Sequence, residues 1–311
     1  MKWVLIPVLL VCASCGQKEV PLPVAPAPRY QVSDFKGLPA LNEVERFLGL
    51  GSSRVAGTPG AQKAADYLVE RLQAMGVYTT LDAFQDPSPD GTNTFRNVMG
   101  VIPGKQDGIV ILAAHYDLKS GIDSFVGAND SGSGVGLLLA LAPILKAGSS
   151  EGSSIWLVFF DGEECRVNYG VNDGLHGSRH LAKKLAADGR SGKVQAFMLM
   201  DMIGDKNLTV TIPRNGDSTL ISAVFKAAAE AGKRAAFSLA DYSILDDHQP
   251  FIDKGIPAVD FIDFEYGSAP RMNDYWHTAA DTLDKLSADS LETVGQVVLR
   301  VLNGLASSTG K

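Results

Sequence analysis

The sequence predicts an α/β domain built as a three-layer sandwich, in which helices flank a central, mostly parallel (mixed) sheet. The chain has 311 residues, enough to bury such a core without disulfide bonds. Segments with strand and helix patterns alternate along it, the order expected of parallel strands joined by crossover helices. Two expected strands, 155–160 and 194–200, are uninterrupted apolar runs, as is typical of parallel strands covered on both faces.

Each further element follows from the spacing of its apolar residues. Helical spacing predicts helices over 41–50 and 61–75, and an apolar surface almost all round predicts a buried helix over 131–145. The other expected elements are the strands 98–102, 109–114 and 258–262 and the helices 177–187, 219–231 and 287–305. The sequence contains no internal repeat and no linker to a second domain. Residues 39–311 are therefore expected to form one domain.

Composition and charge exclude several classes of protein. Hydrophobic residues make up 45% of the chain and charged residues 20%, a mixture that excludes a disordered chain and a coiled coil. The formal net charge is −7. A general nucleic-acid binder needs a basic face to meet the phosphates, so we expect no nucleic-acid partner.

The N-terminus carries a targeting segment. Lys2 precedes the apolar run 3–11, which fits a secretory signal and is too short for a transmembrane helix of about 20 residues. The segment Ala13-Ser14-Cys15-Gly16 resembles the lipobox of bacterial lipoproteins, in which the cysteine is lipidated. An ordinary signal peptide cut nearby is the alternative.

The lipobox resemblance implies a domain held at the bacterial cell envelope, on the periplasmic or extracellular face. Residues 1–15 would be the signal peptide and Cys15 the lipidated residue, so the membrane would be contacted by the lipid anchor only. Residues 16–38 would be a Pro-rich tether. Cys165 would be the only cysteine certain to remain after Cys15, which leaves no intramolecular disulfide.

Polar side chains follow three of the expected strands at the point where each strand ends. His115 follows the strand 109–114, Glu164 comes shortly after 155–160, and Asp201 follows 194–200. The carboxyl ends of parallel strands form the ligand crevice of an open α/β sheet. We therefore expect these side chains to lie close together.

Two further residues complete a set of potential metal ligands. Asp130 lies just before the buried helix, and His277 lies late in the chain. Imidazole nitrogens and carboxylate oxygens are usual ligands of zinc. Neighbouring Glu163 adds a carboxylate that can move protons as a general base and acid. His176 and His180 are expected to be structural, because no acids match them along the chain.

These motifs resemble the zinc aminopeptidase superfamily, which also contains the glutaminyl cyclases. The resemblance spans about residues 40–305, and the matching residues are His115-x-Asp117, Asn129-Asp130, Glu163-Glu164, Asp201 and His277-Thr278. In the aminopeptidase branch two zinc ions share the match of Asp130, and His115, Asp201, Glu164 and His277 supply the other ligands. In the animal-type cyclase branch one zinc is held by the matches of Asp130, Glu164 and His277.

Several segments are more similar to the cyclase branch. They are the strand and loop at 82–97, the segment 173–181, and Asp246-Asp247-His248-Gln249-Pro250-Phe251, which resembles the cyclase Asp-Asp-His-x-Pro-Phe. Trp276 directly before His277 is also a cyclase feature.

The resemblance implies a zinc-dependent glutaminyl-peptide cyclotransferase, which converts the N-terminal glutamine of peptides or proteins to pyroglutamate and releases ammonia. Glu163 would carry the proton, Asp201 and Asp247 would support that relay, and Trp276 would line the substrate entrance. One zinc ion is expected.

Two alternatives stay open. The first is a two-zinc aminopeptidase that hydrolyses N-terminal residues, with Glu163 activating water and His115 and Asp201 binding the second metal. The second is a catalytically silent lipoprotein that binds peptides or sugars.

Overall fold

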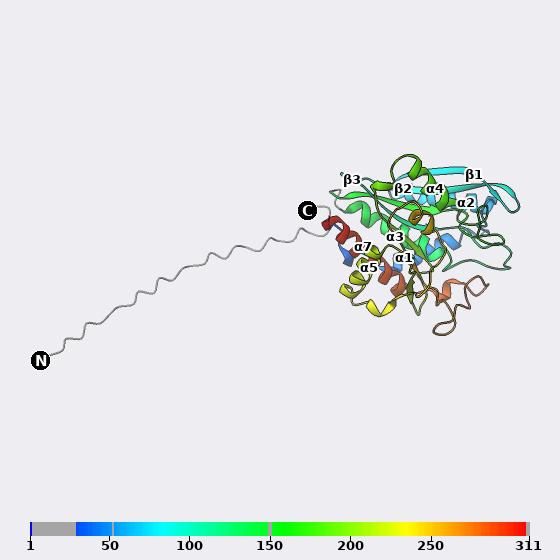
Figure 1. Cartoon of the computed structure of the whole chain (residues 1–311). Helices are drawn as coiled ribbons and strands as arrows, with labels where there is room; N and C mark the ends of the chain where they lie inside the picture. The colour runs from blue at the N-terminus through cyan, green and yellow to red at the C-terminus, as the bar shows by residue number, and fades with distance from the viewer. Residues whose placement is uncertain (2–28, 52, 149–150, 309–311) are drawn as a thin grey trace.

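A computed structural model of the chain describes residue 1 and residues 29–51, 53–148 and 151–308. Its centre is a six-stranded sheet in the order β1-β2-β4-β3-β5-β8 (Figure 1). The strands are β1 (Tyr78–Ser88), β2 (Gly91–Ile102), β3 (Gln106–His115), β4 (Ser153–Phe160), β5 (Val194–Asp201) and β8 (Ala258–Ile262). Strands β4, β3, β5 and β8 run parallel to one another, whereas β2 is antiparallel to both β1 and β4. The predicted mixed, mostly parallel sheet is confirmed.

Helices cover both faces of this sheet and complete the predicted three layers. The helices are α1 (Gly37–Leu48), α2 (Pro59–Ala74), α3 (Gly132–Ala147), α4 (His176–Ala187), α5 (Ser218–Glu230), α6 (Gln249–Ile252) and α7 (Ala288–Ser308). Val110, Leu112 and Ala114 of β3 join the core cluster formed with α1, α2, α3, α5 and α7. Their alternate neighbours Ile109 and Ile111 join the cluster formed with α4 and α6. The strand is apolar throughout because both of its faces are buried.

Helix α3 is apolar all round because other elements enclose it. It contacts α1, α7 and strands β3, β4 and β5. Two glycines permit this approach: a Cβ at Gly134 would lie 2.3 Å from the Met200 carbonyl oxygen, and one at Gly136 would lie 2.7 Å from that of Ala40. The helix therefore fixes the loop before it, which carries Asp130, against the centre of the sheet.

The domain begins earlier than the boundary at residue 39 that we predicted. Tyr30 and Phe35 are buried in the core, and the backbone of Tyr30 exchanges two hydrogen bonds with the Asn303 side chain, each 2.9 Å long. Because Tyr30 and Phe35 are buried in the core, residues 29–38 are part of the folded domain and not of the predicted tether. The predicted signal peptide beyond residue 1, Cys15 and tether residues 16–28 lie outside the described residues.

The hairpin of β1 and β2 is longer than apolar spacing indicated. The two strands pair from Tyr78↔Val101 to Ser88↔Gly91. Strand β1 has no buried residue, so it lacks the apolar run that marked the central strands. A second, two-stranded sheet of β6 (Val210–Ile212) and β7 (Phe237–Leu239) was also missed, since three-residue strands leave little pattern.

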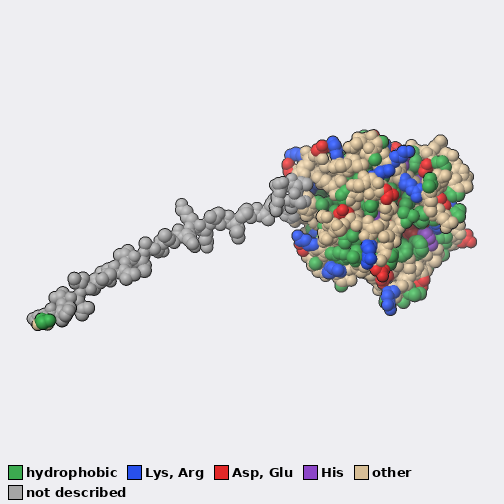
Figure 2. All heavy atoms as spheres, in the orientation of Figure 1, with side chains coloured by type: hydrophobic (Ala, Val, Ile, Leu, Met, Phe, Trp, Pro, Cys, Tyr) green, Lys and Arg blue, Asp and Glu red, His purple; other side chains and the backbone are tan. Residues whose placement is uncertain are grey.

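The described helices include none with both the length and the apolar character needed to cross a membrane. The visible face of the domain carries basic and acidic side chains interspersed with apolar ones (Figure 2).

Candidate metal centre

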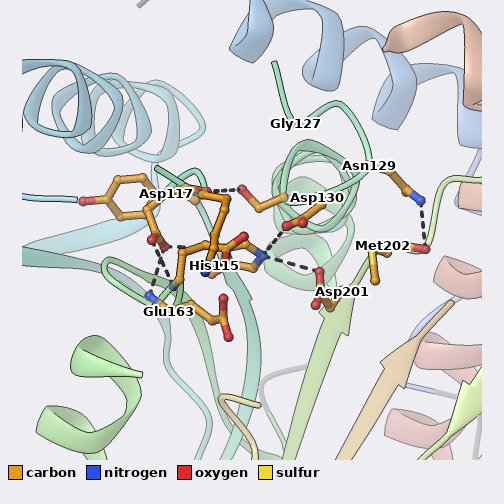
Figure 3. Close-up of polar contacts among 12 residues, drawn as sticks. His115, Asp117, Gly127, Asn129, Asp130, Glu163, Asp201 and Met202 are labelled. Atoms are coloured by element: carbon orange, nitrogen blue, oxygen red, sulfur yellow. Dashed lines mark hydrogen bonds and ion pairs between the residues drawn. The ribbon is translucent and has the colours of Figure 1, made fainter. Parts of the chain in front are cut away.

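The carboxyl ends of the central strands bring the predicted ligands together. His115 ends β3, Asp201 ends β5, and Glu164 lies in the loop that follows β4. Asp130 enters from the loop before α3, and His277 from the loop between β8 and α7. Figure 3 shows His115, Asp130 and Asp201 pointing toward one another.

Asp130 lies between the two histidines and divides the ligands into two groups. His115 Nε2 is 3.1 Å from Asp130 Oδ1 and 3.4 Å from Asp201 Oδ1. His277 Nε2 is 3.3 Å from Asp130 Oδ2 and 2.9 Å from Glu164 Oε1. Each group offers three ligand atoms close enough to hold one ion, and Asp130 belongs to both.

Buried polar atoms without partners show that these residues suit a cation. His115 Nε2, Asp130 Oδ2, Glu164 Oε2 and Asp201 Oδ1 have no hydrogen-bond partner in the described structure. Leaving such atoms unsatisfied in a protein interior is costly, and a bound cation would satisfy several of them at once. Each group supplies one imidazole and two carboxylates, a donor set that fits zinc.

The charge around Asp130 also depends on whether His115 and His277 are protonated. Burial alone would raise the pKa of Asp130, but its close contacts with the His115 and His277 imidazoles outweigh burial and lower that pKa. Burial lowers the pKa of His277, and contacts with Asp130 and Glu164 reverse this and raise it to about 9. A metal at His277 must displace this proton, so metal binding strengthens as the pH rises.

Two further aspartates hold the backbone of the ligand loops. Asp281 accepts hydrogen bonds from the Asn129 and Asp130 amides at 2.8 and 3.0 Å. Asp117 accepts from the Glu163 and Glu164 amides at 3.1 and 3.2 Å. Both acids are fully buried. Asp117 belongs to the His115-x-Asp117 motif, whereas Asp281 was not predicted, because its only signal is an acid four residues after His277.

A pocket opens beside Asp130, Glu164 and His277, with a volume of about 280 Å³. Its wall includes Glu163, Asp201, Asp246, Tyr242, Phe264 and Trp276. The Trp276 ring stacks on the His277 ring at 4.1 Å between centroids and leans on Phe264 at 5.2 Å. The pocket therefore combines carboxylates near the candidate metal ligands with aromatic rings around them.

Tyr169 contacts Glu163, the carboxylate predicted to transfer the proton. Its hydroxyl donates a 2.8 Å hydrogen bond to Glu163 Oε1. Burial, followed by repulsion from Glu164, raises the pKa of Glu163 well above the usual range of a glutamate. Tyr169 was missed because nothing marks an aromatic residue six positions after a glutamate as its partner.

The loop that presents Tyr169 is held in place by Asp173. This carboxylate accepts backbone hydrogen bonds from Arg166, Val167 and Asn168 at 2.6, 2.8 and 3.0 Å. Gly174 has a φ of +73°, and a Cβ there would lie 2.5 Å from the Tyr169 ring. The loop is therefore shaped to place the phenol against Glu163.

Two adjacent aspartates, Asp246 and Asp247, differ in their relation to the pocket. Asp246 lines the pocket, whereas Asp247 is fully buried and does not line it. Burial raises the pKa of Asp247 to about 7. The relay role that we assigned to Asp247 stays a prediction, and Asp246 is the member of the pair that faces the pocket.

A third cluster of possible ligands, Asp246, His248 and Asp260, is not suited to a metal. The Asn215 amide is oriented by its own bonds, since its oxygen accepts from the Ile244 amide at 3.1 Å and its nitrogen donates to Gln249 Oε1 at 2.8 Å. That nitrogen also lies 2.8 Å from His248 Nε2, which must therefore accept. The ring proton then sits on Nδ1, the nitrogen that faces Asp260, and a protonated nitrogen cannot bind a metal.

His176 and His180 lie away from the metal centre, as predicted, but the expectation that no acids match them was wrong. His176 Nδ1 is 2.7 Å from Asp86 Oδ2, and His180 Nε2 is 3.3 Å from Asp82 Oδ2. Both acids belong to β1. Because β1 was not recognised from apolar spacing, its acids could not be matched to α4.

Comparisons with known proteins agree with this geometry. Peptidase family M28 matches residues 97–302. A glutaminyl-peptide cyclotransferase of Boiga irregularis is 30% identical over 292 residues, covering 80% of this chain and 78% of that protein. The crystal structure of a glutaminyl cyclase from an Acidobacteriales bacterium has a TM-score of 0.83 and 37% identity, covering 94% of this chain and 100% of that one. A Zn-dependent exopeptidase from Parabacteroides distasonis has a TM-score of 0.77 and 28% identity, covering 88% and 99% of the two chains.

Proposed function

The chain belongs to peptidase family M28, and we propose that it is a zinc-dependent glutaminyl-peptide cyclotransferase of that family. It converts the N-terminal glutamine of peptides or proteins to pyroglutamate and releases ammonia. The observation that carries the proposal is the small pocket in which Glu163 faces the space beside Asp130, Glu164 and His277. The chain is similar to glutaminyl cyclases over most of its length and of theirs, and this similarity favours cyclisation over hydrolysis.

One zinc ion would be held by Asp130, Glu164 and His277. Zinc supplies a Lewis acid that polarises the carbonyl of the glutamine side-chain amide. Asp281 and Asp117 hold the backbone of two ligand loops, so the side chains are positioned before any ion arrives. The Lys119 ammonium lies 3.8 Å from Glu164 Oε2 and balances part of the charge of that carboxylate.

Glu163 moves the proton. The α-amine of the substrate attacks the side-chain carbonyl carbon, and Glu163 accepts a proton from that nitrogen. The same carboxyl then gives the proton to the amide nitrogen, which leaves as ammonia. Because amine and carbonyl belong to one residue, the pocket needs only to fold the glutamine back on itself. Trp276 and Phe264 form the aromatic wall around the folded glutamine. Asp201 and Asp247 would support the proton relay, and Asp246 lines the pocket beside them.

An aminopeptidase is the second candidate, and one observation favours it. Asp130 offers one oxygen to each histidine, so His115 and Asp201 could hold a second zinc ion that shares Asp130. Such a pair of ions suits the activation of water for peptide hydrolysis.

Substrate choice separates the two reactions. We expect Gln-led peptides to lose ammonia with the corresponding mass decrease, and Leu-led or Ala-led peptides to stay intact. Mass spectrometry of both peptide sets, with an ammonia assay, measures this. Release of free leucine without ammonia from Gln-led peptides would establish the aminopeptidase instead.

Tyr169→Phe tests the positioning of Glu163. The variant keeps the ring over Gly174 and removes only the hydroxyl that donates to Glu163 Oε1. A hydrogen bond to a charged group contributes about 1.5–3 kcal/mol, so we expect kcat to fall by about 10- to 100-fold. Steady-state kinetics with KM and zinc content near wild type would support the role. An unchanged kcat would contradict it.

We also propose that Cys15 carries a lipid and that the domain is tethered to the bacterial cell envelope. The lipobox resemblance at 13–16 supports this location. Cys15→Ala is expected to move the protein from the membrane fraction to the soluble fraction, because a tether without its acyl chains cannot anchor the domain. Fractionation followed by mass spectrometry of the mature N-terminus measures this. An unmodified terminus downstream of Cys15 would contradict the proposal.

A further inference from the structure

A second cavity adjoins the catalytic pocket and carries the opposite charge. It lies between α4 and α6 and has a volume of about 320 Å³. We call it the basic groove and define it by Arg179, Lys183, Leu245, Pro250 and Lys254. Neither the likeness to known proteins nor the proposed reaction assigns it a role.

Leu245 joins the two cavities. This side chain lines both the catalytic pocket and the basic groove, and it is half exposed between them. The next residue, Asp246, faces the catalytic pocket. The two cavities therefore adjoin at Leu245.

The cations of the groove are not neutralised. Within the described part of the chain, no ion pair links Lys183 or Lys254 to an acid. The Arg179 guanidinium donates to the backbone carbonyl oxygens of Gly170 and Val171 at 2.5 and 3.1 Å. Asp253, an acid at the edge of the groove, accepts a 2.7 Å hydrogen bond from Gln249. Three cations thus face one acid on a protein whose net charge is −7.

From this arrangement we propose that the basic groove binds an acidic side chain of the substrate, a few residues after the N-terminal glutamine. An extended peptide advances about 3.3 Å per residue, so a few residues of the substrate carry the chain past Leu245, which lines both cavities. The apolar floor at Pro250 accepts the methylenes of a glutamate, and the cations around it face the carboxylate. The proposal rests on the proposed function and adds a substrate class to it.

Matched peptides test the groove. The substrates are short amidated peptides that begin with Gln-Ala. They differ only in having a Glu, a Gln or a Lys at the third or fourth position. Exposed charge pairs are individually weak, so three cations are expected to make kcat/KM for the Glu peptide about three- to tenfold higher than for the Lys peptide. The difference should shrink at about 0.5 M sodium chloride, because salt screens exposed charges.

The second part of the experiment reverses the charge of the two groove lysines. In the double variant K183E/K254E the ratio of kcat/KM between Glu and Lys peptides is expected to fall to about one or below. Lys226→Glu is the matched control: this lysine lies on α5, outside both cavities, and is 78% exposed. Its variant should keep the wild-type ratio. Both groove lysines are exposed, so their replacement should not disturb folding.

The outcomes distinguish the groove proposal from the proposed cyclase function on which it rests. If all three peptides release ammonia at equal kcat/KM, the groove proposal is overturned and the cyclase function stands. A Glu preference that persists in the double variant also overturns it. If no Gln-led peptide releases ammonia, the proposed function itself fails.

Discussion

Glu163→Gln is expected to lower kcat by about 10²–10⁴ while the zinc content stays near wild type. The substitution keeps the size of the side chain and removes its ability to accept a proton. Glu163 faces the pocket, whereas Glu164 contacts His277 at 2.9 Å, so the two neighbouring carboxylates have separate positions. Loss of the proton carrier should therefore leave the metal ligands in place. Kinetics with a Gln-led peptide and metal analysis of the same sample measure both effects.

The control for Glu163→Gln replaces a surface carboxylate in the same way. Glu70→Gln makes the same chemical change on the exposed side of α2, and it should leave kcat and zinc content unchanged. If Glu163→Gln loses zinc, Glu163 acts as a ligand. If it keeps the full rate, another group moves the proton.

His277→Ala is expected to abolish zinc binding and activity together. A site with three protein ligands cannot lose one and keep its ion, and the remaining carboxylates, Asp130 and Glu164, would repel each other. Lewis-acid assistance contributes several kcal/mol, so the rate should fall by about three orders of magnitude or more. Metal analysis by mass spectrometry and an ammonia assay measure the two losses.

His115→Ala is the matched variant that counts the ions. Both histidines contact Asp130, but only His277 belongs to the group proposed to hold the single zinc. The His115 variant should therefore retain about one zinc per chain. Because His115 is buried, a thermal melt must first show that the variant is folded. A wild-type protein with two tightly bound ions, one of which is lost with His115, would favour the aminopeptidase.

The sequence by itself determined the class of the fold and the chemical character of the site. Uninterrupted apolar strands such as 155–160 require burial on both faces, so the layered sheet follows from local pattern alone. The polar residues directly after those strands had to meet at one edge, because parallel strands end on the same side. For this reason His115 and Asp201 could be predicted to lie together although more than 80 residues of chain separate them. In the structure His115 Nε2 is 3.4 Å from Asp201 Oδ1.

Only the tertiary structure decided the contacts made by residues whose local pattern is uninformative. Strand β1 has no buried residue, so its pairing with β2 and the link from Asp86 to His176 left no apolar signal. The end of the predicted tether was misplaced because the burial of Tyr30 depends on α7, at the other end of the chain.

The same limit applies around the reacting centre. Tyr169, Asp281 and the basic groove owe their positions to loops, where side-chain direction has no fixed period. Apolar periodicity reports which face of an element is buried, but it does not report which distant side chain meets it there. The sequence therefore indicated the candidate ligands that the structure brings together. Packing decided what orients Glu163 and what lies beside the pocket, because those contacts exist only after the loops have been brought together.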